Sequence, residues 1–339
     1  MATTTPETEP AKPARIAYAE KDQLGPLGVR ASALHDPLEL RARLLAEFER
    51  AVSAAKAAAA MVDQSSTSAV HESRKALRRA RAVLAMVAGA LPKSEHRAVR
   101  AALQGARRSL STVRDHAVAP GALGSLTLGD GEREIAKRVL DNAAEAIPAA
   151  AEIKQLLGEA AARAAAQAEA LAAALPPGLA WDVVTAGIAR TYRAARRART
   201  KAKHSRPAFH TWRRRSKELL YQLDFLADHA GARTLAIRAD LDEITDRLGP
   251  AVDLLMLREF VQTYAQGLPQ GGVEQLRDEL DQQLERRMKD ARKAGRDAFR
   301  RGAKKFVRRV TKAVRRDLTP ADDNGGGDAD DDQGGDDRA

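Results

Sequence analysis

Residues 71–87 read HESRKALRRARAVLAMV, and this stretch combines a basic stripe with an apolar stripe. On a helical wheel of about 100° per residue, the basic side chains and the histidine share one face. This face carries His71, Arg74, Lys75, Arg78 and Arg81. The opposite side carries Leu77, Val83, Leu84 and Val87. The pattern predicts an amphipathic helix that buries its apolar side and presents cations on the other.

The same pattern occurs a second time, at residues 210–226, which read HTWRRRSKELLYQLDFL. The second stripe consists of His210, Arg213, Arg214, Lys217 and Tyr221. Further along each half, Leu103, Leu110 and Asp115 have the same spacing as Leu241, Leu248 and Asp253. The separation between the two halves is the same, to within one residue, for these residues as for the two histidine motifs. Two matching clusters indicate an internal duplication, with about four helices in each half.

The composition agrees with an all-α fold built from two four-helix bundles. Helix-forming residues dominate the 339-residue chain, aromatic residues make up 4%, and alternating β patterns are absent. The chain has no cysteine, so disulfides and thiolate metal sites are excluded and a cytoplasmic location is expected. No uninterrupted apolar run reaches the length of a membrane-spanning helix.

Proline and glycine divide the chain. We expect a flexible leader at 1–34, a first helical half at 35–175, a second at 176–318 and a disordered acidic tail at 319–339. Asp36 and Pro37 predict the first helix start, and a long alanine-rich helix kinked at Pro148 is expected to end the first half. In the second half, we expect a break before Pro250 and one last helix over 273–318.

The charge distribution points to an anionic partner. The formal net charge is +11, although residues 321–339 alone hold eight aspartates and one arginine. Such a balance is typical of proteins that bind nucleic acid, polyphosphate or an acidic membrane surface. Two further rows of cations at helical spacing add Arg100, Arg107 and Arg114, and Arg190, Arg193, Arg197 and Lys201. Like charges at this spacing cost about tenths of a kcal/mol per pair, a cost that a bound polyanion would relieve.

The two motifs, His71-x-x-Arg74-x-x-x-Arg78-Arg79-x-Arg81 and His210-x-x-Arg213-Arg214-x-x-Lys217-x-x-x-Tyr221, resemble the CHAD domain, the conserved histidine α-helical domain. The resemblance covers about residues 35–316. It implies two pseudo-symmetric bundles around a basic central groove or pore that binds inorganic polyphosphate, and an association with polyphosphate granules. It carries Arg79 over as a further site residue. Lys75 departs from the family pattern, where an apolar residue is usual, and Leu220 stands where a further arginine is usual.

We therefore expect noncatalytic polyphosphate binding, with no enzyme activity, cofactor or metal. Histidines at metal-ligand spacing, clustered carboxylates and a glycine-rich phosphate loop are all absent from the sequence. Asp115 and Asp253 are single residues whose simplest role is capping a helix or pairing with an arginine. Nonspecific nucleic-acid binding is the main alternative and a phosphate-processing enzyme the second. The sequence leaves open the oligomeric state, the preferred polymer length, and whether binding serves storage, granule targeting or regulation.

Overall fold

Asp36 begins the first helix as the sequence predicts, because its carboxylate accepts hydrogen bonds from the backbone N–H groups of Leu38 and Glu39 at 2.8 and 3.0 Å. The computed structural model describes residues 34, 36–229 and 231–318, so the expected leader and acidic tail lie outside the described residues, apart from Leu34. Within the described part, eleven helices and no strands are present. They are α1 (Pro37–Ala60), α2 (Ser66–Val87), α3 (Lys93–Ser109), α4 (Ser111–Gly124), α5 (Asp130–Ala144), α6 (Ala150–Ala174), α7 (Trp181–Lys201), α8 (Arg206–His229), α9 (Ala232–Tyr264), α10 (Gln270–Ala298) and α11 (Ala303–Leu318).

Two of the expected long helices are interrupted. The chain leaves the helix before Pro148, so α5 and α6 are separate helices rather than one kinked helix. A proline has no N–H to donate and disfavours helical geometry in the residue before it. The expected last helix is likewise divided into α10 and α11, at residues 299–302.

Helix α3 ends at Ser109, and α4 starts two residues later. Helix α4 continues to Gly124 and includes Pro120.

The expected break before Pro250 is wrong, because α9 runs through this proline without interruption. The residue before it is Gly249, which has no Cβ. The steric clash between a proline ring and the preceding Cβ is therefore absent. Local sequence favoured a break, and the packing of both sides of α9 overrides it, since Leu248 and Ala251 are fully buried.

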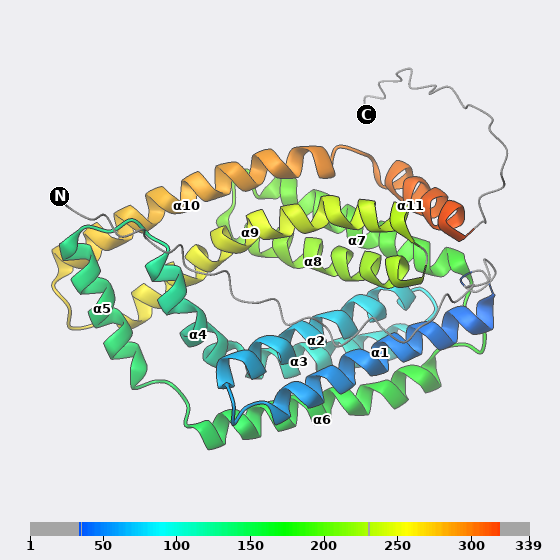
Figure 1. Cartoon of the computed structure of the whole chain (residues 1–339), viewed down its shortest axis with the longest axis horizontal. Coiled ribbons are helices and arrows are strands. Elements are labelled where there is room, and N and C mark those ends of the chain that lie inside the picture. Colours follow the sequence, from blue (N-terminus) through cyan, green and yellow to red (C-terminus); the bar gives the residue numbers. More distant parts are fainter. Residues whose placement is uncertain (1–33, 35, 230, 319–339) are drawn as a thin grey trace, which may run out of the picture.

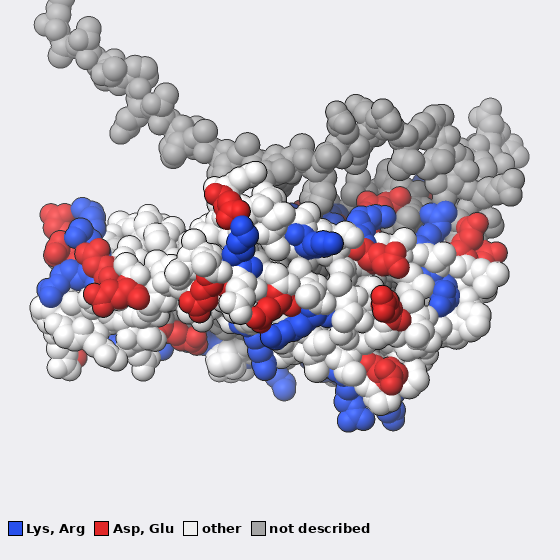
Figure 2. Space-filling view, turned by 90° about the horizontal axis from the view of Figure 1, so that it is seen from below, with Lys and Arg blue, Asp and Glu red and all other residues white. Residues whose placement is uncertain are grey.

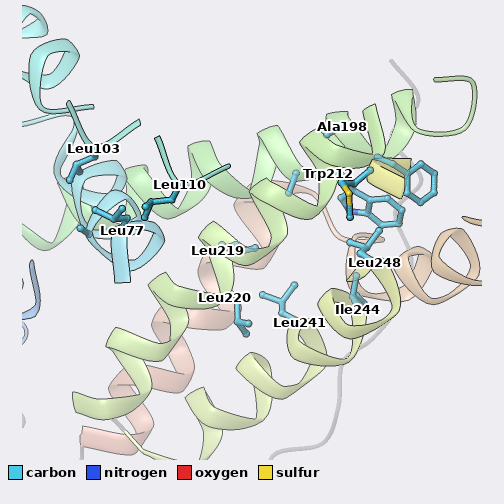
Figure 3. Packing of buried hydrophobic residues seen from close by; sticks show 14 of the residues in the cluster. Leu77, Leu103, Leu110, Ala198, Trp212, Leu219, Leu220, Leu241, Ile244 and Leu248 are labelled. Atoms are coloured by element: carbon cyan, nitrogen blue, oxygen red, sulfur yellow. The ribbon is translucent and has the colours of Figure 1, made fainter. Parts of the chain in front are cut away.

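The helices form two packed groups that meet along α2 (Figure 1). In the first group α1 and α3 pack on α6, and α2 packs on α1. In the second group α8 packs between α7 and α9, and α10 and α11 cover α9. The apolar stripes of both groups join one core, in which Figure 3 shows Leu77, Leu103 and Leu110 close together and Ile244 and Leu248 beside Trp212. Leu103 and Leu110, like Leu241 and Leu248, are therefore core residues.

Helices α4 and α5 leave the first group and pack against α9 and α10 (Figure 1). Polar contacts secure this crossing: Asn142 donates to the carbonyl of Tyr264 at 2.9 Å, and Arg287 donates to the carbonyl of Ser125 at 3.1 Å. The all-α fold is confirmed, whereas the internal duplication stays a prediction. None of the helices in the described residues is long and apolar enough to cross a membrane.

The contact between α2 and the second group is close and specific. Gly187 of α7 lies against the backbone of Met86, where an added Cβ would come within 2.4 Å of the Met86 carbonyl oxygen. Gln222 of α8 is fully buried and donates to the carbonyl of Ala82 at 3.3 Å and to the Thr191 hydroxyl at 3.1 Å. This contact brings the basic faces of α2 and α8 together.

Candidate functional site

A groove of about 330 Å³ lies between α2 and α8 and is closed by residues of α3, α4 and α9. We call it the α2–α8 groove. Its cationic lining consists of Arg74, Arg78, Arg81, Arg107, Arg114, His210, Arg213, Arg214 and Lys217. Ser111, Asp115, Thr211, Val252, Met256 and Glu259 complete the wall. Most of the two basic stripes expected from the sequence therefore line one cavity.

The amphipathic pattern of each helix explains this orientation. On α2, Leu77 and Leu84 are buried in the core, which turns Arg74 and Arg81 toward the groove. On α8, Trp212 is fully buried on the side away from His210. The helices thus present these cations to a shared groove.

Six of the groove arginines have no carboxylate partner. Within the described residues, ion pairs are absent for Arg74, Arg78, Arg81, Arg107, Arg213 and Arg214. The Nε atoms of four of them are buried without a hydrogen-bond acceptor: Arg74, Arg81, Arg107 and Arg213. Arg74 does donate from Nη1 to the carbonyl of Arg107, at 3.0 Å. A buried donor without an acceptor is costly, so the groove is built at the expense of stability.

Burial and crowding lower the pKa values of five of these arginines: Arg74, Arg81, Arg107, Arg213 and Arg214. Arg74 is 6% exposed, and burial, together with the nearby charge of Arg107, lowers its pKa to about 9. Burial also lowers the pKa of Arg81 to about 10, although Glu218 opposes the shift. The pKa of Arg213 is lowered mainly by burial. An anion in the groove would favour the charged form of each group and relieve this strain.

One end of the groove is neutralised by carboxylates. Arg114 donates to Asp115 at 3.0 Å and, across the two halves of the chain, to Asp253 at 2.6 Å. The expectation that these aspartates pair with an arginine is thus confirmed. Glu259 also lines the groove, and its charge, like that of Asp115, acts on His210. An anion would be bound less favourably beside these carboxylates.

Two predicted residues, Arg79 and Tyr221, lie beside the groove, next to a separate charge network. Arg79 is 3.7 Å from the Asp224 carboxylate and 5.5 Å from the centre of the Tyr221 ring. Asp224 also accepts a hydrogen bond from Arg238 at 2.7 Å. Lys217 lines the groove but lies 3.8 Å from Asp242 of this network.

The two motif histidines differ in position. His210 lines the groove, and burial lowers its pKa from the ordinary value, partly offset by Glu259. The side chain of His71 is 67% exposed and lies 4.0 Å from Glu72. Glu72 also pairs with Lys75 at 3.2 Å. His71 and Lys75 are therefore placed outside the cavity itself.

Cations continue beyond Arg81 into a smaller recess of about 210 Å³. Arg100 of α3 and Arg190 of α7 line it together with Arg81, as the sequence predicts. Arg215 lines it too, and His96 was missing from the predicted set. His96 precedes Arg100 by one helical turn, so the same spacing argument could have found it.

The remaining predicted cations of α7 lie elsewhere. Arg193 lines a recess between α7 and α11, and Arg197 and Lys201 are exposed. The face drawn in Figure 2, on the side of α6 in Figure 1, carries Lys and Arg interspersed with Asp and Glu among large uncharged areas. Cations are thus not concentrated equally on every face of the molecule.

Two comparisons with known proteins give matches. The family model described as CHAD domain matches residues 43–262. The crystal structure of the CHAD domain from the plant Ricinus communis is similar to the chain with a TM-score of 0.56 and 19% sequence identity, over 80% of this chain and 97% of the other. That similarity supports the fold. A search of curated proteins gives no match.

Proposed function

Since this chain belongs to the CHAD-domain family, we propose that it binds inorganic polyphosphate in the α2–α8 groove without altering it chemically. One observation carries the proposal: six arginines from two facing walls converge on one cavity and have no carboxylate partner in the described residues. A guanidinium offers a planar fork of donors that matches phosphate oxygens. Phosphates would supply the acceptors that the buried Nε atoms lack.

The shape of the cationic surface favours a flexible polymer over a single phosphate. The groove and the smaller recess are neighbours, because Arg81 lines both. Arg100 and Arg190 extend the path away from the end occupied by Asp115 and Asp253. We propose that the polymer enters by the recess and runs toward His210.

The groove is poorly suited to single-stranded nucleic acid, the main alternative. Proteins that bind single strands stack bases on aromatic side chains. The groove lining contains no tryptophan, tyrosine or phenylalanine. Trp212 is fully buried in the core, and Tyr221 lies against Arg79. Phosphates without bases fit this wall best.

A noncatalytic role is supported by the hydrogen bonds of the carboxylates at the end of the groove. Phosphoryl-transfer enzymes use carboxylates to hold magnesium ions. Here Asp115 and Asp253 are both hydrogen-bonded to Arg114. In the described residues, no group of three potential ligands is arranged to hold a metal ion. We further propose that the protein acts in the cytoplasm, at polyphosphate granules.

A competition assay tests the proposal. Long-chain polyphosphate, single-stranded DNA, tRNA and heparin would compete for the full chain at fixed salt. A groove variant, Arg74→Gln, Arg107→Gln and Arg213→Gln, would be compared with a control that removes three arginines outside the groove, Arg133→Gln, Arg138→Gln and Arg163→Gln.

We expect polyphosphate to be the strongest competitor. The groove variant should lose polyphosphate binding, and the control variant should retain it. Preferential nucleic-acid binding that the groove variant keeps would contradict the proposal. Release of phosphate from polyphosphate in the presence of magnesium would instead indicate a phosphate-processing enzyme.

A further inference from the structure

A further recess, of about 610 Å³, lies between α10 and the C-terminal end of α7 with the residues that follow it, and is lined almost entirely by cations. Its lining consists of Arg199, Lys203, Lys289, Asp290, Arg292, Lys293 and Arg296. We call the five residues Arg199, Lys203, Lys289, Lys293 and Arg296 the α7–α10 cluster. The α2–α8 groove contains none of them.

Little internal charge neutralises this cluster. Asp290 is the one carboxylate in the lining. The sixth cation, Arg292, is already engaged, because it donates to the carbonyl of Ala202 at 3.2 Å and lies 5.2 Å from the centre of the Phe209 ring. It therefore shapes the wall of the recess and leaves the cluster exposed.

Arg199 holds a donor at this recess that no acceptor satisfies. Its Nε atom is buried and has no hydrogen-bond partner. Burial lowers its pKa, and the charges of Arg296 and Arg196 lower it further. A buried guanidinium donor among like charges is costly unless an anion completes its hydrogen bonds.

Helix α8 separates this recess from the groove. His210 faces the groove, whereas Phe209 and Trp212 are fully buried on the other side. Trp212 packs so closely on α10 that an added Cβ at Gly295 would lie 2.3 Å from its ring. A continuous apolar layer thus stands between the two cationic surfaces, so each would bind an anion independently.

We propose that the α7–α10 cluster is a second binding site for the phosphates of inorganic polyphosphate, so that one protein molecule holds two strands or two parts of one long strand. This inference rests on the proposed function of the groove for the identity of the polymer. The aromatic residues near the recess, Phe209, Trp212 and Phe299, are fully buried, so no surface for base stacking is available. A bare phosphate chain therefore fits better than single-stranded nucleic acid.

The binding stoichiometry of the full chain tests this inference. The cluster variant is Lys203→Ala, Lys289→Ala, Lys293→Ala and Arg296→Ala, all at exposed positions, with Arg199 kept for stability. The matched control removes three lysines and one arginine at exposed positions elsewhere: Lys56→Ala, Lys137→Ala, Lys154→Ala and Arg163→Ala. Both variants have the same net charge, so a difference between them reports position.

Isothermal titration with a short polyphosphate of uniform length should show fewer chains bound to the cluster variant than to the control. Affinity for long-chain polyphosphate should fall by roughly a hundredfold or more, because linked binding at two sites is lost. Equal stoichiometry and affinity in the two variants would overturn the inference. Tighter binding of single-stranded DNA or tRNA than of polyphosphate at this cluster would overturn it too.

The groove variant separates this inference from the proposed function. If the groove variant still binds polyphosphate at the α7–α10 cluster and the cluster variant still binds it in the groove, both sites are supported. If it binds as the wild type does while the cluster variant does not, the groove proposal fails and the cluster remains. If polyphosphate binds neither wild type nor variants, both proposals fall.

Discussion

The number of unpaired groove arginines sets how steeply polyphosphate binding should depend on salt. Each phosphate neutralised on a nucleic acid contributes a slope of about −0.7 to −0.9 to a plot of log affinity against log salt concentration. Six arginines line the groove without a carboxylate partner in the described residues. If each contacts one phosphate and polyphosphate holds counterions as nucleic acid does, the slope should be about −4 to −5.

Such a slope corresponds to a loss of affinity of about 250- to 1,000-fold between 50 and 200 mM salt. Fluorescence anisotropy with a labelled short polyphosphate measures it across that range. The cluster variant serves as the starting protein, so that only the groove is titrated. A slope near −1 would mean that the arginines do not act together and would refute the reasoning.

Single substitutions sharpen the test. Arg107→Gln should reduce the steepness by about 0.7 to 0.9, because one phosphate contact is lost. Arg79→Gln should leave the slope unchanged, since Arg79 lies outside the groove, beside Asp224. Equal effects of the two substitutions would show that overall charge matters and that the groove does not.

Three further predictions concern packing, protonation and the C-terminal residues. Gly187→Ala should destabilise the protein by about 1–3 kcal/mol in chemical denaturation, because its Cβ would meet the backbone of Met86, whereas Gly158→Ala, at an exposed helical site, should stabilise it by about 0.5–1 kcal/mol. Equal effects would contradict the close approach of α2 and α7. Burial lowers the pKa of His210 and a bound phosphate should raise it, so binding should take up a proton and strengthen as the pH falls from 7 toward 6. Titration calorimetry in buffers of different ionisation enthalpy measures this proton uptake. If the His210→Gln variant takes up as many protons as the wild type, a group other than His210 is responsible. Deleting residues 321–339, which hold eight aspartates, should tighten polyphosphate binding at low salt, and unchanged affinity would show that these charges do not compete.

The fold class and the facing stripes could be predicted from the sequence because both depend on local periodicity. The apolar positions of α2 and α8 determine which side is buried, and the cations follow on the other side. The crossing of α4 and α5 onto α9 and α10 could not be predicted. It depends on contacts between distant segments, such as that of Asn142 with Tyr264.

The structure brings the central residues of the predicted site together in one groove and leaves several outer ones outside it. Tyr221 lies near the middle of its wheel face, yet it contacts Arg79 instead of the groove. A helical wheel describes direction and ignores position along the axis, so residues beyond the crossing of α2 and α8 share the face and miss the cavity. The recess between α7 and α10 was missed because its cations come from two helices distant in sequence.

A structure of the full chain with a bound short polyphosphate would test the central claim most directly. The account predicts phosphates between α2 and α8, hydrogen-bonded at once to Arg74 or Arg107 on one wall and to Arg213 or Arg214 on the other. A groove without phosphate, with the polymer held elsewhere on the molecule, would contradict it.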